Sequence, residues 1–107
     1  MRNLALVIAA AAAGAFTAAG VALAQQGASV TIASFKFGPE SVNAAAKAPI
    51  TWVNKDGAPH QVVVASKNLK TAVLNKDQSG RLTIAEPGTY DYVCGIHPSM
   101  KGKIVVK

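Results

Sequence analysis

The chain has 107 residues, half of them hydrophobic, and a formal net charge of +6 at pH 7. Residues 1–24 contain 19 hydrophobic residues, whereas residues 25–107 contain 35 and still carry a formal charge of +5. This second segment has the composition of an ordinary globular domain, which excludes intrinsic disorder, and its single cysteine excludes an internal disulfide framework.

The first 24 residues have the pattern of a helical signal peptide. Arg2 supplies the positive start, Leu4 to Val21 is almost entirely apolar, and Ala22 to Ala24 matches the small-x-small cleavage pattern. A retained membrane anchor is the alternative, because this stretch is long enough to span a bilayer. Its alanine-rich composition favours cleavage. We therefore expect a mature domain over residues 25–107 in a bacterial periplasm, where a lone thiol is reactive unless something occupies it.

The mature segment is expected to be all-β. It contains ten valines, five isoleucines and five threonines but only three leucines, a composition that favours strands over helices. The expected strands, in chain order, are residues 30–37 with an irregularity near 33–34, then 49–54, 61–65, 81–85, 90–93 and 103–107. Residues 41–48 show no clear pattern, and residues 69–74 fit a short strand or a helical turn. Short strands separated by turns favour a sandwich of two sheets.

The aromatic and basic residues of this segment are interpreted mainly as structural. Trp52 is expected in the core, and Tyr90 or Tyr92 could form a hydrogen-bonded tyrosine corner. The nine lysines are scattered along the chain, so we expect no basic stripe for nucleic-acid binding.

Four side chains concentrate the chemistry of the segment. Cys94, His97 and Met100 share one seven-residue stretch, and His60 opens a strand far upstream. A thiolate, two imidazoles and a thioether form the His₂Cys set with a weak axial sulfur that is typical of blue copper sites. Soft sulfur suits Cu(I) and imidazole suits both oxidation states. A site held between their preferred geometries needs little rearrangement when an electron is gained or lost.

Each of these residues also has a plainer interpretation. A lone cysteine is usually a small buried hydrophobe, a methionine often fills a gap, and a histidine beside a strand is usually not a ligand. The joint spacing of all four favours a metal site. Zinc bound by two histidines, the cysteine and a water is an alternative, against which Met100 argues because a thioether is a poor zinc ligand.

The two ligand-bearing stretches, residues 50–60 and 88–106, resemble the cupredoxins. The Cys-x2-His-x2-Met spacing resembles the amicyanin branch, and pseudoazurin and plastocyanin are more distant. The resemblance implies a Greek-key β-sandwich of about eight strands. It also implies one type 1 copper ion, cycling between Cu(I) and Cu(II), bound by His60, Cys94, His97 and Met100.

Three residues beside the ligands depart from the amicyanin pattern. Gln61 stands where Asn is usual and Gly95 where Thr is usual, so the side-chain link between the two ligand loops cannot form in its usual way. Ile96 replaces a proline and therefore has an N–H. We hypothesise that this N–H donates to the Cys94 sulfur and raises the reduction potential. Gly95 adds a competing expectation, a looser loop.

The resemblance implies a soluble one-electron shuttle between redox proteins rather than an enzyme. Two histidines cannot supply a second copper centre in one chain. His97 is expected to conduct the electron, within an apolar patch to which Gly95, Ile96 and Pro98 contribute. Candidates for a surrounding ring of charge, facing an acidic partner, are Lys55, Lys101 and Lys103.

The main alternative is a copper-carrying or copper-buffering protein without redox duty, which would use the same ligands. The chain has no additional Met- or His-rich segment, which favours the shuttle. We expect the mature form to be a monomer that is not embedded in a membrane and docks only transiently with its electron donor and acceptor.

Overall fold

The computed structural model describes residues 27–107, so the signal peptide expected over residues 1–24 lies outside the described part. The described residues form nine strands and one short 3₁₀ helix, η2 (Ala65–Lys67). The strands are β1 (Ala28–Ala33), β2 (Lys36–Gly38), β3 (Ser41–Ala44), β4 (Pro49–Asn54), β5 (Val62–Val64), β6 (Leu69–Lys70), β7 (Ser79–Thr83), β8 (Gly88–Cys94) and β9 (Lys101–Val106). Within residues 27–107, no helix has the length and apolar character needed to cross a membrane.

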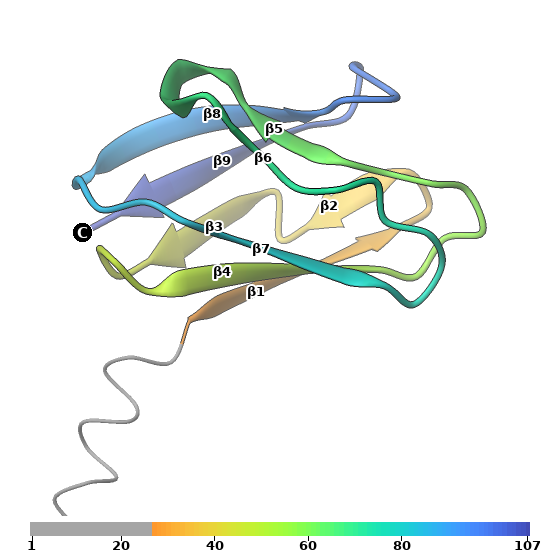
Figure 1. Cartoon of the computed structure of the whole chain (residues 1–107), viewed down its shortest axis with the longest axis horizontal. Coiled ribbons are helices and arrows are strands. Elements are labelled where there is room, and N and C mark those ends of the chain that lie inside the picture. Colours follow the sequence, from red (N-terminus) through yellow and green to blue (C-terminus); the bar gives the residue numbers. More distant parts are fainter. Residues whose placement is uncertain (1–26) are drawn as a thin grey trace, which may run out of the picture.

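The strands form two sheets that pack into the sandwich expected from the sequence (Figure 1). One sheet has the order β2-β1-β4-β7 and the other has the order β3-β9-β8-β5-β6. The pairs β1–β4 and β3–β9 are parallel, and the other pairs are antiparallel. The all-β class and the sandwich of two sheets are thereby confirmed. The structure has nine strands where about eight were expected, and β6 is only two residues long.

The single irregular strand expected over residues 30–37 is wrong. The chain reverses at Ser34 and Phe35, and β1 and β2 pair as an antiparallel hairpin. Both turn residues have positive φ angles, 52° and 58°, a conformation that Gly or Asn usually supplies in such turns. The carboxylate of Asp56 stabilises the turn by accepting the N–H groups of Ser34 (2.7 Å) and Phe35 (2.9 Å). No local sequence signal marks this turn, because the stabilising carboxylate comes from a distant segment.

The other expected strands agree closely with the structure. β4 coincides with residues 49–54, and β5, β7, β8 and β9 differ from expectation by one or two residues at their ends. The unassigned residues 41–48 begin with strand β3. Of the two possibilities for residues 69–74, the short strand is correct at β6, and a helical turn, η2, directly precedes it.

Side-chain alternation directs one face of each strand into the space between the sheets. Ile50, Trp52 and Asn54 of β4 are buried, as are Tyr92 and Cys94 of β8. Trp52 therefore lies in the core as expected, and its ring contacts that of Tyr92 edge to face with centroids 5.4 Å apart. Because inward positions recur at every second residue, the packing of Tyr92 also points Cys94 inward.

Three chain reversals lie together at one end of the sandwich. The β1–β2 turn, the β4–β5 loop and the β8–β9 loop all project at the end that faces away from the C-terminus (Figure 1). Cys94 is the last residue of β8 and therefore opens one of these loops. Chemistry at this end can draw on residues from three distant parts of the sequence.

The tyrosine corner is made by Tyr90. Its hydroxyl donates to the carbonyl oxygen of Glu86 at 2.7 Å, which joins the start of β8 to the preceding turn. Tyr92, two residues later, faces the core, and its hydroxyl has no hydrogen-bond partner. Burial raises the pKa of Tyr92 to about 12, so the phenol stays protonated at neutral pH.

Replacing each tyrosine by phenylalanine distinguishes the contributions of the two hydroxyls to the free energy of unfolding. Tyr90→Phe removes the bond to Glu86, and we expect a loss of about 1 kcal/mol in the free energy of unfolding. Tyr92→Phe removes a buried hydroxyl without a partner, and we expect a neutral or stabilising effect. Urea denaturation measures both variants. An equal loss in the two would contradict this distinction.

Candidate metal centre

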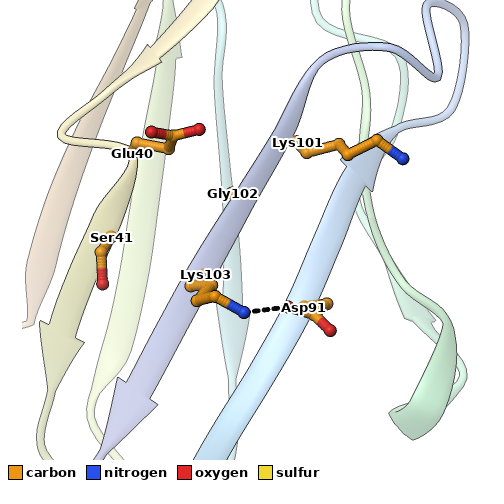
Figure 2. A pocket seen from close by; sticks show the side chains of 6 residues that line it. All are labelled: Glu40, Ser41, Asp91, Lys101, Gly102 and Lys103. Atoms are coloured by element: carbon orange, nitrogen blue, oxygen red, sulfur yellow. Dashed lines mark hydrogen bonds and ion pairs between the residues drawn. The ribbon is translucent and has the colours of Figure 1, made fainter.

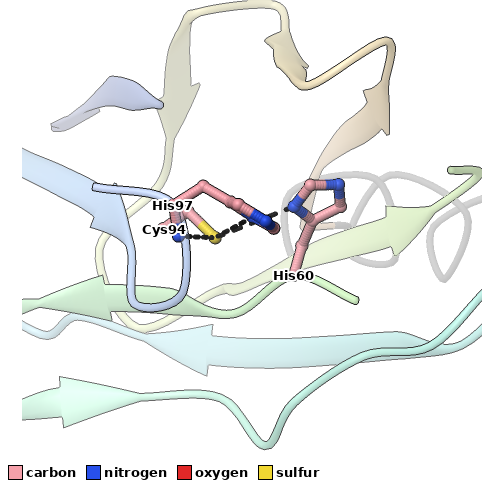
Figure 3. A group of neighbouring side chains, drawn as sticks. All are labelled: His60, Cys94 and His97. Carbon is pink, nitrogen blue, oxygen red and sulfur yellow. Dashed lines mark hydrogen bonds between the residues drawn. The ribbon is translucent and has the colours of Figure 1, made fainter. Parts of the chain in front are cut away.

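Three side chains from two loops converge at this end of the sandwich (Figure 3). The ligating atoms of His60, Cys94 and His97 all lie within 4.8 Å of one another. The sulfur of Cys94 is 3.7 Å from Nδ1 of His60 and 3.8 Å from Nδ1 of His97. His60 and Cys94 are fully buried and His97 is half-buried, so the cluster is closed on the core side and open only beside His97.

Strand register explains why His60 and Cys94 meet. β5 and β8 are antiparallel, and Val62 lies opposite Cys94. His60 precedes Val62 by two residues and is buried like it, so it occupies the next inward position beyond the end of β8. Its backbone is fixed on the other side by Leu74, through two hydrogen bonds of 3.0 Å and 2.7 Å between the N–H of each residue and the carbonyl of the other. Both side chains are thus delivered by sheet pairing rather than by loop flexibility.

The loop from Cys94 to Met100 is closed by its own backbone. The Cys94 N–H donates to the Met100 carbonyl at 3.0 Å, and the Met100 N–H donates to the His97 carbonyl at 2.9 Å. Met100 is buried at the end of the loop. The backbone of the fourth expected ligand is therefore hydrogen-bonded to that of Cys94.

His60 is oriented by a carboxylate that the sequence analysis did not single out. Its Nε2 lies 2.9 Å from a carboxylate oxygen of Asp56, which also accepts the two N–H groups of the hairpin turn. The N–H of Phe35, followed by His60, holds the pKa of Asp56 below its usual value despite the opposing effect of burial. An ionised Asp56 places the imidazole proton on Nε2, so Nδ1 is left as a free lone pair facing the sulfur.

Phe35 covers both imidazoles from outside. Its ring packs edge to face against His60 and His97, with centroids 5.1 Å and 5.0 Å apart, although 49% of Phe35 is exposed. The two imidazoles also contact each other at 5.1 Å. The three rings form one cluster in which His60 is sealed and Phe35 is accessible to a partner.

The spacing of the donor atoms fits a single metal ion bound by all three side chains. With metal–sulfur and metal–nitrogen bonds of about 2.3 Å and about 2.05 Å, a trigonal arrangement separates sulfur from nitrogen by about 3.8 Å and a tetrahedral one by about 3.6 Å. The observed distances, 3.7 Å and 3.8 Å, lie within this range and are compatible with either arrangement. A thiolate and two neutral imidazoles in this arrangement can hold one metal ion that prefers soft ligands.

The hypothesis that the Ile96 N–H donates to the Cys94 sulfur is wrong. The donors to the sulfur are the N–H groups of Gln61 and His97, each at 3.4 Å. The loop folds back at His97 rather than at Ile96, whose side chain is 39% exposed. The sulfur thus receives two backbone donors, one from each ligand loop, which withdraw charge from a thiolate.

Gly95 does not leave the space beside Cys94 empty. The Gln61 side chain occupies the position where a Cβ of Gly95 would stand, and the Gly95 N–H donates to the Gln61 carbonyl at 3.0 Å. The two departures from the amicyanin pattern therefore contact each other. A looser loop was expected because Gly95 has no side chain to contact the other ligand loop. In the structure, Gln61 makes that contact instead.

Three residues around the site were interpreted too simply from the sequence. Phe35 and Asn54 are expected from the sequence only as strand residues, and Asp56 has no expected role. Asn54 is fully buried and donates to the carbonyls of Ala58 (2.9 Å) and Leu74 (2.8 Å), which shapes the loop before His60. A carboxylate four residues before a candidate histidine ligand is the signal that could have identified Asp56.

Comparison with known proteins identifies the family. A family model described as a cupredoxin-like domain matches residues 4–106. The chain belongs to the cupredoxin-like family. This cupredoxin-like chain is 39% identical over 83 residues to amicyanin from Paracoccus denitrificans, an alignment that covers 73% of this chain and 63% of that protein. It is 40% identical over 83 residues to amicyanin-alpha from Methylorubrum extorquens, covering 73% of this chain and 70% of the relative.

The structural comparison agrees with the sequence comparison. A Cu(I) form of an amicyanin mutant matches with a TM-score of 0.70 at 38% identity, and the match covers 76% of this chain and 82% of that chain. The amicyanin resemblance drawn from the ligand spacing is thereby confirmed. The chain aligns with less than two thirds of the Paracoccus denitrificans relative, so the match concerns the cupredoxin-like domain.

The role of Asp56 can be tested with Asp56→Asn. The amide keeps one acceptor oxygen but replaces the other with an NH₂ donor, so either the hairpin turn or His60 together with Phe35 faces a donor in place of its acceptor. Loss of a carboxylate that orients a ligand typically costs about 10- to 100-fold in metal affinity. Competitive titration of the metal-free protein with Cu²⁺ or Zn²⁺ measures this loss. Asp77→Asn is the control, because Asp77 is exposed and pairs only with Lys55. Equal losses in the two variants would contradict a specific role.

Proposed function

We propose that this protein is a mononuclear type 1 copper protein that carries single electrons between redox proteins and is not itself an enzyme. The observation that carries the proposal is the convergence of one cysteine sulfur and two imidazoles within metal-binding distance of a common point, with two backbone donors on the sulfur. We propose His60, Cys94, His97 and Met100 as the ligands. The relatives named amicyanin, and the Cu(I) title of the structural match, support copper as the metal.

Copper is favoured over zinc by the chemistry of the donors. Met100 would add a thioether, which is a poor ligand for zinc, whereas soft sulfur ligands together with two imidazoles suit copper. Bound there, copper would supply a reversible one-electron couple between Cu(I) and Cu(II). The protein's own contribution is to hold its ligands in nearly the same place in both states.

The surface around His97 supports transient docking. The large hydrophobic side chains that are most exposed in residues 27–107 are Phe35, Val73 and Ile96. Each is near a proposed ligand: Phe35 contacts both imidazoles, Ile96 precedes His97, and Val73 precedes the Leu74 that pairs with His60. Pro98 and Gly95 are exposed on the same loop. A small apolar contact of this kind suits the weak encounters of electron transfer, with His97 as the route into the site.

Three lysines were expected to form a ring of charge, called here the docking rim, around the apolar patch at His97. They differ in whether they are already held in an ion pair with an acidic residue of the same protein. Lys55 is paired with Asp77 at 3.1 Å, and Lys103 is paired with Asp91 at 2.7 Å. Figure 2 shows Lys103 turned toward Asp91, while Lys101 extends apart from it near the ligand loop. Lys101 and Lys36 line a groove of about 430 Å³ beside Phe35 and Met100, and neither takes part in an ion pair within the described residues. We propose that these two lysines favour an acidic face on the redox partner.

We also propose that residues 1–24 act as a cleaved signal peptide and that the mature monomer works in a bacterial periplasm. The cleavage pattern at Ala22 to Ala24 supports export. Metal coordination would protect the single buried thiol in an oxidising compartment.

Copper loading tests the proposed function directly. Adding Cu²⁺ to the periplasmic protein, whose mass should correspond to a start at Gln25, is expected to produce an intense blue sulfur-to-copper absorption and a reversible one-electron wave at an electrode. Cys94→Ser should abolish the absorption. Lys47→Ala is a suitable surface control, because Lys47 is exposed and far from the ligands in sequence.

The outcomes separate the alternatives. A colourless protein that retains only Cu(I) would support a copper carrier or buffer instead. Tight binding of Zn²⁺ with no blue product from Cu²⁺ would support a zinc site. Either result would refute the electron-carrier proposal.

The charge of the docking rim can be tested with a matched pair of variants. Lys101→Glu and Lys103→Glu change the net charge equally, but Lys101 lies closer to the ligand loop. We expect Lys101→Glu to slow oxidation by ferricyanide several-fold at low ionic strength and to speed reaction with hexaammineruthenium, with smaller effects for Lys103→Glu. The difference in rate between the two variants should disappear at about 1 M salt, which screens exposed charges. Stopped-flow kinetics measures the rates, and equal effects of the two variants would exclude a local role for Lys101.

A further inference from the structure

Phe35 occupies a turn position that disfavours a large side chain. Ser34 and Phe35 form the two-residue loop between β1 and β2, and their φ angles of 52° and 58° are those of a type I′ turn. Gly and Asn adopt such angles most readily, whereas a bulky residue does so at a cost. Phe35 is also 49% exposed, so burial in the core offsets little of that cost. The turn and the core alone therefore give no reason for an aromatic residue at this position.

The ring of Phe35 contacts both proposed histidine ligands. It packs edge to face against His60 and His97, with ring centroids 5.1 Å and 5.0 Å away, and the two imidazoles lie 5.1 Å from each other. Each of the three rings thus touches the other two. Because His60 is fully buried and Phe35 is half exposed, the Phe35 ring lies on the outer side of this cluster.

The two imidazoles differ in what else holds them. Nε2 of His60 lies 2.9 Å from Oδ2 of Asp56, and the His60 backbone is paired with that of Leu74. His97 lies in the loop after β8, and within the described residues its ring has one hydrogen-bonding contact, from Nδ1 to the Cys94 sulfur 3.8 Å away. Since a cysteine sulfur is a weak hydrogen-bonding partner, the position of the His97 ring depends mainly on packing against Phe35 and His60.

Asp56 also fixes the place of the Phe35 ring. Its Oδ2, the atom beside His60, accepts the Phe35 N–H at 2.9 Å, and its Oδ1 accepts the Ser34 N–H at 2.7 Å. The backbone that carries the ring is therefore bound to the same carboxylate as the buried imidazole. This shared acceptor holds the Phe35 ring in a defined place over the two histidines.

The Phe35 ring lies where the ligand cluster opens to solvent. His60 and Cys94 are fully buried, whereas His97 is half-buried, so a metal ion would enter or leave on the side of His97. The Phe35 ring packs against His97 on this side. For the His97 imidazole to turn outward and open the cluster, it must first lose its contact with Phe35.

We infer that Phe35 is a positioning residue that keeps the His97 imidazole against the Cys94 sulfur and thereby slows exchange of the bound metal with solvent. The inference rests on the proposed function in that His60, Cys94 and His97 are taken as copper ligands. It also explains the aromatic residue in the turn, because the ring is needed at the ligand although glycine would suit the backbone better.

Phe35→Gly separates this role from that of the turn. Glycine suits a φ of 58°, so the hairpin should stay intact while the ring is lost. In the reduced, copper-loaded protein, we expect removal of Cu(I) by bathocuproine disulfonate to become several-fold faster. In the metal-free reduced protein, NMR relaxation should show a more mobile His97 ring. The His60 ring should be unchanged, because Asp56 still holds it.

Phe35→Tyr and Val73→Ala are the controls. Tyrosine keeps the ring, so copper removal and His97 mobility should match those of the unmodified protein. Val73 is exposed to a similar extent, 47%, but it offers no ring to the imidazoles, so its truncation should leave copper removal unchanged.

Three results would overturn the inference. They are an unchanged rate of copper removal in Phe35→Gly, an equal acceleration in Val73→Ala, and an equal gain in mobility of the two imidazoles. If the unmodified protein takes up no copper, the proposed function fails instead. The mobility of the His97 ring in the metal-free variants then still decides whether Phe35 positions it.

Discussion

The sulfur of Cys94 is held between two backbone N–H groups that come from different loops. Gln61 supplies one donor from the loop before β5, and His97 supplies the other from the loop after β8, each at 3.4 Å. Because Val62 and Cys94 also pair in the sheet, the two loops are connected through the protein's own backbone. The donor atoms therefore converge through the protein's own hydrogen bonds. A site prepared in this way has little to rearrange between two oxidation states, which suits electron transfer better than storage.

A second constraint, the carboxylate of Asp56, connects this interior to the surface. It binds the N–H groups of Ser34 and Phe35 and the Nε2 of His60. The same group thus orients a buried imidazole and places the Phe35 ring over both histidines. Ligand geometry and the shape of the exposed apolar patch are therefore coupled. A change in the β1–β2 turn would alter both the site and the surface that a partner meets.

Prediction from the sequence succeeded where the structural information is local or repeated along the chain. A β-favouring composition and short strands separated by turn residues predict a sandwich, and the spacing of Cys94, His97 and Met100 predicts a compact ligand loop. It failed where a short segment depends on a distant partner. The hairpin at Ser34 was missed because its stabilising carboxylate is 22 residues away. The Ile96 hypothesis failed because residue identity alone does not tell which N–H a folded loop turns toward the sulfur.

The sequence by itself determined the class of the fold and the set of soft side chains available for a metal. It also determined that the cysteine lies where a strand ends and a loop begins. Only the tertiary structure decided that His60 faces the sulfur through Nδ1, that Asp56 holds its other nitrogen, and that the Gln61 amide fills the space beside Gly95. The physical reason is the range of the forces involved. Alternation and turn preferences act between neighbours in the chain, whereas hydrogen bonds and side-chain packing select partners that become neighbours only after the sheets have formed.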